Sequence, residues 1–502
     1  MQLNGEDLQI LEPDKVVVSK KDDVYINVEC DKSVSRELVD YFTFEVPGAQ
    51  FMPQYRNRYW DGKIRLFNSN NTLYYGLVPY LSKFCEQRQY NFVVDESIES
   101  AENFSRSEAV DYIDTLGLPF EPRDYQIDAF TYGVRNRRGL LLSPTASGKS
   151  LIIYLLVRYH NLKTLIIVPT ISLVHQMAGD FKSYGYDMEC HKITAGADKI
   201  SDNDITVSTW QSIYKLDKKW FSQFDLIVGD EAHLFKSKSL TSIMTKLVDC
   251  KYRFGLTGTI DDAQTHRLVL EGLFGPLKSI VKTKTLIDKK QLSDFNIKAI
   301  VLKYDDDTCK LVKDMKYADE MDFLVRNEQR NKFIKNLSLS LSGNSLVLFQ
   351  FVEKHGKQLY QLIKDSAEQD REVFFVCGET DAETREQVRA ITEASNNAII
   401  IASYGTFSTG INIRSLHNIV FASPSKSRIR NLQSIGRGLR KAEGKETATL
   451  IDIADDCSWK KNVNYTLKHF AERIKLYNEE NFDYKIYKVK LNGRRIQTPT
   501  VI

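Results

Sequence analysis

The chain has 502 residues, of which 42% are hydrophobic and 27% charged, and its 69 basic and 66 acidic side chains leave a net charge of +3. This length predicts about three domains, because single cores rarely grow much beyond about 200 residues. The near balance of charges excludes a uniformly basic protein, so any surface that binds nucleic acid must be local.

The seven cysteines are scattered without a close pair, which argues against both a disulfide framework and a zinc site. No apolar run approaches the length that spans a bilayer, and the N-terminus has no apolar signal region. We therefore expect a soluble protein with no membrane partner, located in the reducing cytoplasm.

Residues 1–100 are predicted to form a small α+β domain. Apolar side chains at Val24, Ile26 and Val28 alternate with polar ones, which is typical of a half-buried strand. The following apolar residues share one face of a helix: Val34, Leu38, Tyr41 and Phe42.

Basic and aromatic side chains are interleaved in the next stretch, residues 55–67. Lys63, Arg65 and Phe67 alternate with Ile64 and Leu66, so the basic residues are predicted to face away from the core. Such a surface suits phosphate contacts and base stacking, although a hairpin with a solvated basic face and a core tryptophan gives the same pattern. The candidate DNA-binding residues are Arg56, Arg58, Trp60, Lys63 and Arg65.

Residues 95–115 are acidic and rich in serine, which suits a linker. Beyond them, strand-like apolar runs alternate with helical stretches, an order that predicts parallel sheets with crossover helices. The runs form two series, which are assigned to domains at 101–285 and 286–502 joined near residues 282–296. The predicted strands are 140–142, 164–168, 205–208, 226–229 and 253–256, then 345–349, 372–376, 398–402, 419–422 and 448–453.

A candidate phosphate-binding loop lies between the apolar run 139–142 and the apolar helical stretch 151–159. Its turn aims backbone N–H groups at one point, at the positive end of the following helix. Lys149 would reach the β and γ phosphates, and the Ser150 hydroxyl would hold Mg²⁺. The strict pattern has glycine where this chain has Ser143. The remaining candidate loop residues are Pro144, Thr145, Ala146, Ser147 and Gly148.

An acidic pair follows the predicted strand 226–229. Mg²⁺-dependent phosphoryl transfer needs one carboxylate for the metal and one to orient the attacking water. We assign Asp230 to the metal and Glu231 to the water, with His233 as a further candidate nucleotide-site residue.

The run Asp230-Glu231-Ala232-His233 resembles the DEAH form of motif II in superfamily-two helicases and translocases, and the other family motifs stand in order. The resemblance implies two tandem RecA-like domains behind the small N-terminal domain, and the use of ATP and Mg²⁺. It implies adenine contacts from Arg123 and Gln126 (Q-motif). It implies contacts to the nucleic-acid strand from four residues of motifs Ia and Ib: Thr170, Gln176, Thr209 and Trp210.

Later motifs complete the resemblance. Residues 256–259 resemble motif III, 348–352 motif IV, 408–412 motif V and 433–440 motif VI. The nucleotide contacts implied there are Gly410, Asn412 and Gln433, although Asn412 stands where an acid is common.

A guanidinium fork neutralises the charge that spreads over the γ-phosphate oxygens in the transition state. Arg437 and Arg440 are expected on one face of a helix in the second α/β domain. ATP would therefore draw the two domains together, and hydrolysis would release them.

The segment 57–66 resembles the N-terminal domain of the UvsW-like branch-migration helicases of phages. This implies ATP-driven remodelling of DNA in replication, recombination and repair, in the cytoplasm of a host cell. The implied activities are fork regression, Holliday-junction migration, unwinding of R-loops and strand annealing. The implied partners are branched, single-stranded and duplex DNA, with RNA–DNA hybrids and a single-strand-binding protein as candidates. Two alternatives stay open: a duplex translocase that does not separate strands, and an ATP-gated nucleic-acid clamp.

Overall fold

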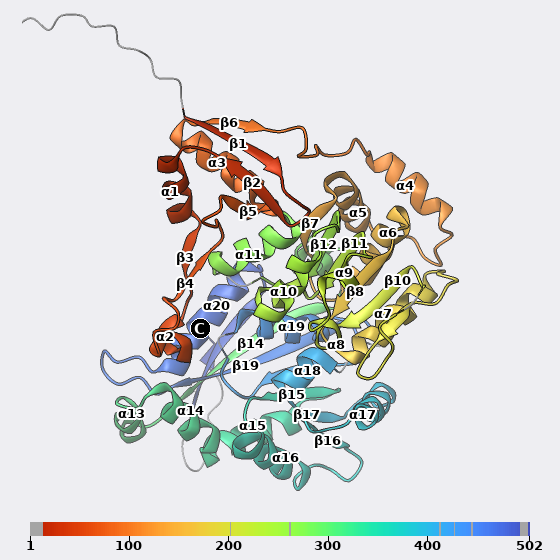
Figure 1. The fold of residues 1–502 in the computed structure, drawn as a ribbon. Helices are drawn as coiled ribbons and strands as arrows, with labels where there is room; N and C mark the ends of the chain where they lie inside the picture. Colours follow the sequence, from red (N-terminus) through yellow and green to blue (C-terminus); the bar gives the residue numbers. More distant parts are fainter. Residues whose placement is uncertain are drawn as a thin grey trace, which may run out of the picture. The chain divides into compact units, whose positions relative to one another are not determined.

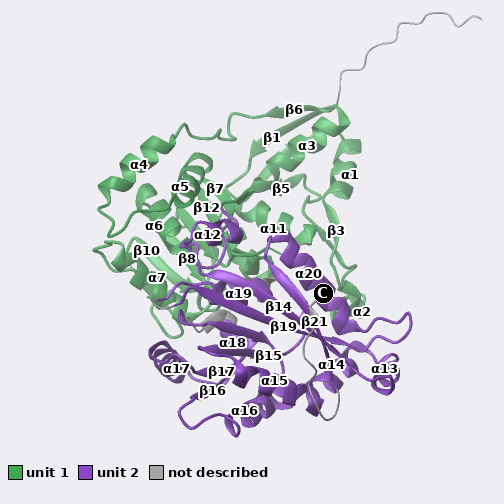
Figure 2. Ribbon diagram, turned by 180° about the vertical axis from the view of Figure 1, so that it is seen from behind, with its two compact units in different colours: residues 1–142, 149–280 green, residues 143–148, 281–502 purple. Residues whose placement is uncertain are grey.

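The computed structural model describes residues 14–200, 202–260, 263–410, 413–425, 427–442, 445–491 and 500–501. Its contacts divide the chain into two compact units, residues 1–142 with 149–280 and residues 143–148 with 281–502 (Figure 2). Across the described ranges, no helix combines the length and the apolar character that a membrane crossing requires. The three-domain division stays a prediction.

The N-terminal part of the first unit is a four-stranded sheet in the order β5-β2-β1-β6. The predicted strand is β2 (Tyr25–Glu29), and the predicted helix is α1 (Lys32–Tyr41), whose Val34 and Leu38 are fully buried. The other elements of this part are β1 (Lys15–Lys20), β5 (Thr72–Tyr74), α3 (Val78–Arg88) and β6 (Asn91–Val94).

A separate hairpin carries the basic and aromatic stretch (Figure 1). Strands β3 (Thr43–Glu45) and β4 (Lys63–Arg65) pair antiparallel, and the short helix α2 (Pro53–Arg56) lies in the connection. The predicted alternation is wrong beyond Arg65. β4 ends there and the chain enters the core, so Phe67 is buried and does not share the basic face.

The predicted linker is wrong in its second half, where residues form helix α4 (Arg106–Thr115). Ser105 Oγ accepts from the Glu108 backbone N–H at 3.2 Å, and the Glu108 carboxylate accepts from the Ser105 N–H at 2.7 Å. This reciprocal capping box starts the helix. The serine and acid that suggested a linker therefore serve as a helix start signal.

A seven-stranded sheet of parallel pairs follows, in the order β13-β7-β12-β11-β8-β10-β9. All five strands predicted for the first series are confirmed. The strands are β7 (Arg138–Leu142), β8 (Thr164–Val168), β9 (His191–Ile193), β10 (Ile205–Thr209), β11 (Leu226–Asp230), β12 (Tyr252–Thr257) and β13 (Leu277–Ser279). The helices are α5 (Asp124–Asn136), α6 (Lys149–His160), α7 (Ile171–Ser183), α8 (Trp210–Ile213), α9 (Lys218–Phe221), α10 (Lys238–Lys246) and α11 (Gln264–Phe274).

The N-terminal sheet and this parallel sheet share one hydrophobic core. A single cluster of buried side chains runs from Val16 and Phe84 to Leu165 and Phe274. Along α11, the Tyr80 hydroxyl donates to the Glu271 carboxylate at 2.5 Å. A Cβ added to Gly76 would lie 1.9 Å from the Glu271 carbonyl oxygen. The two parts are therefore packed backbone against backbone.

The second unit contains an eight-stranded sheet in the order β16-β17-β15-β18-β19-β14-β20-β21, in which only the β20–β21 pair is antiparallel. The second predicted series of strands is confirmed, and with it the tandem RecA-like α/β architecture. The strands are β14 (Asp294–Lys303), β15 (Ser345–Phe349), β16 (Val373–Val376), β17 (Ile399–Ser403), β18 (Asn418–Phe421), β19 (Thr447–Asp456), β20 (Tyr484–Lys490) and β21 (Thr500–Val501). The helices are α12 (Thr283–Asp288), α13 (Asp306–Val312), α14 (Tyr317–Arg326), α15 (Glu328–Ser340), α16 (Lys357–Lys364), α17 (Ala382–Ala394), α18 (Tyr404–Gly410), α19 (Arg428–Gly438) and α20 (Tyr465–Glu479).

The stretch near residues 282–296, where the two α/β domains are predicted to join, contains regular secondary structure. Helix α12 lies inside it, and β14 starts within it at Asp294. Phe295, Ile297 and Ala299 are buried at alternate positions, so the stretch forms an interior strand.

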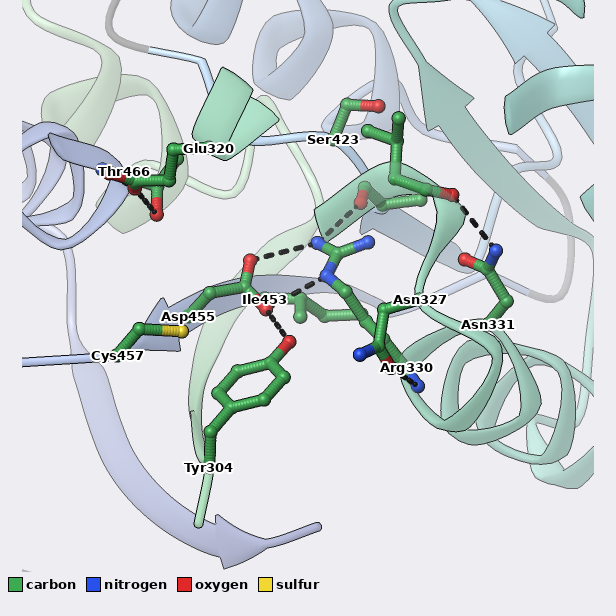
Figure 3. A network of polar contacts seen from close by, with 12 residues as sticks. Tyr304, Glu320, Asn327, Arg330, Asn331, Ser423, Ile453, Asp455, Cys457 and Thr466 are labelled. Atoms are coloured by element: carbon green, nitrogen blue, oxygen red, sulfur yellow. Dashed lines mark hydrogen bonds and ion pairs between the residues drawn. The ribbon is translucent and has the colours of Figure 1, made fainter. Parts of the chain in front are cut away.

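A buried ion pair ties α15 to β19 in this unit (Figure 3). Arg330 donates two hydrogen bonds to the Asp455 carboxylate, at 2.8 and 3.0 Å, and a third to the Ala422 carbonyl. Tyr304 donates to the same carboxylate at 2.7 Å. Both charged side chains have no exposed surface, and breaking such a pair by removing one partner costs about 3–5 kcal/mol.

Candidate functional site

The predicted motifs follow neighbouring strands of each sheet. In the first unit, motifs I, III, II, Ia and Ib come directly after β7, β12, β11, β8 and β10, which are consecutive in the sheet. In the second unit, motifs V, IV and VI follow β17, β15 and β18, again consecutive. The carboxyl ends of parallel strands meet at one edge, where α/β sheets bind ligands.

The phosphate-binding loop has left-handed backbone conformations at two positions. Ala146 has φ of 67° and Gly148 has φ of 77°, and the loop leads directly into the first residue of α6, Lys149. Left-handed residues in a turn gather successive N–H groups into an anion-binding concavity, and the helix dipole adds to it. The strand, turn and helix predicted here are confirmed, while their binding of phosphate stays a prediction.

Two hydroxyl pairs brace this loop. Ser143 Oγ lies 2.7 Å from Ser147 Oγ, and Ser147 also donates to the Pro144 carbonyl at 2.7 Å. The serine that replaces the usual glycine thus closes the base of the loop. Ser150 Oγ, the candidate Mg²⁺ ligand, lies 2.9 Å from the Tyr184 hydroxyl.

Motif II is joined to motif III by a histidine. Glu231 adopts a left-handed conformation with φ of 51°, an uncommon one for a side chain of this size. Its carboxylate lies 3.3 Å from His233 Nδ1, which is also 2.9 Å from Thr257 Oγ1 at the end of β12. Thr257 Oγ1 in turn donates to the Thr259 carbonyl at 2.8 Å. The candidate general base is therefore connected to motif III by direct contacts.

The Asp230 carboxyl has a perturbed acidity. Burial is the largest cause and the Glu231 charge the second, and together they raise the pKa of Asp230 to about 6, although the Lys149 ammonium acts in the opposite direction. Two neighbouring carboxyl groups with one nearby ammonium leave excess negative charge, and a divalent ion bound there would neutralise it.

The Q-motif residues lie at the start of α5. Gln126 is 4% exposed, and its side-chain oxygen accepts the Arg123 backbone N–H at 2.9 Å. Arg123 Nη1 donates to the Tyr125 hydroxyl at 2.8 Å. The Gln126 amide thus caps its own helix here, and its adenine contact stays a prediction.

The four residues assigned to strand contacts differ in exposure. Thr170 caps α7 by accepting the Leu173 N–H at 3.4 Å, and Gln176 is exposed on the same helix. Thr209 is buried and lies 2.9 Å from Ser212 Oγ, while Trp210 packs its ring 5.8 Å from that of Tyr214.

The structure corrects the placement of the motif VI arginines. Helix α19 ends at Gly438, so Arg440 lies past its end and does not share a helix face with Arg437. The Arg437 side chain is outside the described part of the structure. Gln433 is half-buried on α19 and Gly410 ends α18, while Asn412 lies outside the described residues.

Of the basic residues assigned to DNA contacts, Arg56, Arg58 and Arg65 are exposed, whereas Lys63 is half-buried and Trp60 has a structural role. Trp60 is half-buried and donates to the Lys63 carbonyl at 2.8 Å, and Arg65 pairs with Asp61 at 2.5 Å. Arg56 and Arg58 are exposed in the connection between β3 and β4. This connection also exposes large apolar side chains, which are Phe51 (68%), Met52 (42%), Tyr55 (42%) and Tyr59 (85%).

Sequence reasoning missed two aromatic residues beside the phosphate-binding loop. Tyr184 contacts Ser150 and packs edge-on against Phe120, with ring centroids 5.6 Å apart. Phe120 is 45% exposed and precedes the Q-motif. The position of Phe120 shortly before the Q-motif was its only signal in the sequence, whereas only the fold brings Tyr184 to Ser150.

Comparisons with known families agree with these motifs. Residues 15–95 match the family described as the N-terminal part of the DNA helicase UvsW. Residues 119–262 match the family described as the res subunit of type III restriction enzymes.

Two curated proteins and one solved structure are similar over most of the chain. The ATP-dependent DNA helicase UvsW of Enterobacteria phage T4 is 38% identical over 495 residues, covering 93% of this chain and 98% of the relative. The DNA 3'-5' translocase XPB2 of Sulfurisphaera tokodaii is 25% identical over 414 residues, covering 74% and 89%. The crystal structure of T4 UvsW matches with a TM-score of 0.51 at 36% identity, covering 95% of this chain and all of that one.

Proposed function

This chain belongs to the UvsW family of ATP-dependent DNA helicases, and from that premise we propose that it uses ATP hydrolysis to remodel branched DNA. The proposed substrates are replication forks, Holliday junctions and R-loops, so RNA–DNA hybrids are included. Strand annealing and cooperation with a single-strand-binding protein belong to the same proposal, which places the protein in the host cytoplasm. Under this proposal, residues 1–100 bind DNA and the two RecA-like domains supply the motor.

The described residues fit a nucleotide with Mg²⁺. The left-handed pair Ala146 and Gly148 shapes the loop for an anion, and Ser150 and Asp230 offer the hydroxyl and carboxylate oxygens that Mg²⁺ prefers. A bound Mg²⁺ would neutralise charge on the phosphate oxygens. Lys149 binds the β and γ phosphates, Glu231 orients and deprotonates the attacking water, and Arg437 and Arg440 stabilise the transition state.

The exposed connection of the β3–β4 hairpin carries the branched-DNA proposal. Tyr59 and Phe51 are exposed by 85% and 68% beside the exposed Arg56 and Arg58. Aromatic faces stack on unpaired bases and guanidinium groups bind phosphates, a combination that suits a point where duplex opens into single strands. A surface that served only solubility would not expose such large aromatic rings.

The test removes positive charge from the hairpin by the triple change Arg56→Gln, Arg58→Gln and Arg65→Gln. Each lost phosphate contact should lower the salt slope of binding by about one unit, so fork affinity should fall by about tenfold or more. ATP hydrolysis at saturating DNA should be retained, because Lys149 and Asp230 are untouched. The matched control is Lys310→Gln, Lys332→Gln and Lys357→Gln, three exposed lysines of the second unit outside every motif.

Fluorescence anisotropy on a fork and on a plain single strand, across a salt series, measures both the affinity and its salt dependence. Unchanged affinity and slope on both substrates would overturn the role of the hairpin. An equal loss in the control variant would show that general charge, rather than the hairpin, governs binding.

A duplex translocase that does not separate strands is the second candidate, because the chain is similar to an archaeal protein named a DNA 3'-5' translocase. Strand displacement on a forked duplex supports the helicase, whereas removal of a bound roadblock without displacement supports the translocase. An ATP-gated clamp would show neither.

A further inference from the structure

Arg440 is held through its backbone rather than by a helix. Its carbonyl accepts from Lys445 Nζ at 2.8 Å and from Ser293 Oγ at 3.3 Å, and the neighbouring Leu439 carbonyl accepts the Ser293 N–H at 2.9 Å. Since α19 ends two residues earlier, these bonds set the direction in which the Arg440 side chain leaves the backbone.

Lys445 binds three carbonyl oxygens from inside the second unit. Its side chain is buried, with 4% of the residue exposed, and Nζ donates to Arg414 at 3.1 Å, Gly438 at 2.5 Å and Arg440 at 2.8 Å. An ammonium has three N–H donors, so these bonds use all of them. Gly438 is the last residue of α19 and Arg414 follows motif V, so one side chain joins motif VI to the segment after motif V.

The positive charge of Lys445 is stabilised by its position after a helix C-terminus but destabilised by burial and by the charge of Arg440. A cation at a helix C-terminus interacts favourably with the dipole and with the last unpaired carbonyls. Burial, and then the nearby Arg440 charge, lower the pKa of Lys445 to about 7. Three carbonyl acceptors favour the protonated form against both effects.

We propose that Lys445 is a positioning residue for ATP hydrolysis, which fixes the backbone of Arg440 and couples it to the segment after motif V. The inference rests on the proposed role of Arg440 in the transition state. A misplaced guanidinium loses interactions that form mainly in the transition state, so kcat should fall while KM for ATP changes little.

The chain offers a matched control for loss of packing. Arg371, 9% exposed, also donates to three carbonyls, those of Asn397 at 3.1 Å, Leu339 at 2.6 Å and Leu341 at 2.7 Å. None of these belongs to a helicase motif. Arg371→Met and Lys445→Met therefore both remove a buried cation from three carbonyls, and only the second touches motif VI.

The experiment measures DNA-stimulated ATP hydrolysis and the urea unfolding midpoint of the full chain. Lys445→Met should lower kcat by about tenfold or more with KM within about twofold, whereas Arg371→Met should lower the unfolding midpoint but leave kcat near the parent value. Lys445→Arg, which keeps the charge and several donors, should recover most of the lost kcat. If Lys445→Met does not fold, Lys445→Leu takes its place, because its shorter side chain also lacks every hydrogen-bond donor.

Three outcomes would overturn the inference: normal kcat in folded Lys445→Met or Lys445→Leu, an equal loss of kcat in Arg371→Met, or no recovery in folded Lys445→Arg. The variant Arg440→Ala separates this inference from the proposal on which it rests. If Arg440→Ala turns over normally, the transition-state role of Arg440 is wrong. If Arg440→Ala loses turnover while Lys445→Met keeps it, only the positioning role of Lys445 is wrong.

Discussion

At the scale of single residues, the raised pKa of Asp230 makes a prediction about acid. The carboxylate must be ionised to hold the Mg²⁺ proposed for this site, and its pKa is about 6 because of burial and the Glu231 charge. Hydrolysis should therefore fall as the pH drops from 7 to 5.5. Protons and Mg²⁺ compete for the same carboxylate, so raising the Mg²⁺ concentration should move the midpoint to lower pH. A titration of kcat/KM against pH at two Mg²⁺ concentrations checks this, and a midpoint that does not move contradicts it.

The phosphate-binding loop makes a second prediction at this scale. Lys149→Ala removes the charge proposed to face the β and γ phosphates, so hydrolysis should fall by about a hundredfold or more while the fold survives. Lys149→Arg should be similarly poor, because a planar guanidinium does not replace a compact ammonium. Lys192→Ala, an exposed lysine on β9, is the control and should be unaffected. Near-normal hydrolysis in either Lys149 variant would contradict the assignment.

The residues of the candidate site were predictable where a short sequence pattern marks them. The acidic pair Asp230 and Glu231 follows an apolar strand, and Lys149 follows a turn, so both patterns are local. The Tyr184 contact to Ser150 joins residues 34 apart and left no such signal. Arg440 was misplaced because the chain after α19 is held by donors to its carbonyls, Lys445 a few residues further on and Ser293 from a distant segment.

At the scale of elements, the close approach of α11 to the N-terminal sheet predicts a stability effect. A methyl group at Gly76 would lie 1.9 Å from a backbone oxygen of α11, which cannot move without shifting the helix. Gly76→Ala should therefore destabilise the protein by about 2 kcal/mol or more.

The control for this prediction is Gly179→Ala on α7, where a Cβ meets nothing within 4 Å. It should be neutral or stabilise by up to about 1 kcal/mol, because alanine favours helices. Urea unfolding of both variants measures the difference. Equal unfolding midpoints would show that the contact between α11 and the N-terminal part is loosely packed.

Strands and helices were predictable to different degrees. Largely apolar runs such as 164–168 predicted the interior strands directly, because parallel strands are buried on both faces. β14 carries polar side chains at Asn296 and Lys298 between its buried ones, so it lacks the continuous apolar run by which the other interior strands were predicted. α4 was missed because its capping residues, Ser105 and Glu108, have the composition of a linker.

At the scale of the whole molecule, the shared core of the first unit predicts which fragments fold. The cluster that joins Val16 and Phe84 to Phe274 is continuous, so a fragment of residues 14–280 should unfold cooperatively and remain monomeric. A fragment of residues 101–280 loses one side of that core and should aggregate or lack a cooperative transition. Thermal circular dichroism and size-exclusion chromatography compare them. A cooperative, monomeric 101–280 fragment would mean that the N-terminal part is an independent domain.

The sequence predicts the domain series but not this shared core. The alternation of strands and helices along the chain follows from local patterns, whereas the packing of Gly76 against Glu271 joins residues nearly 200 apart. The linker-like composition of residues 95–115 suggested a separate N-terminal module. The N-terminal part is nevertheless packed against α11, and these contacts join residues so far apart in the sequence that no local pattern predicts them.

The shared core also bears on how mechanical work reaches DNA. If a flexible linker joined the hairpin to the domain that carries Lys149 and Asp230, the hairpin would not follow every movement of that domain. Continuous packing between the N-terminal sheet and α11 is stiff, because interiors as dense as crystals compress little. The hairpin should then follow the full displacement of the domain that carries Lys149, so under the proposed function the motor would act on bound DNA without elastic loss.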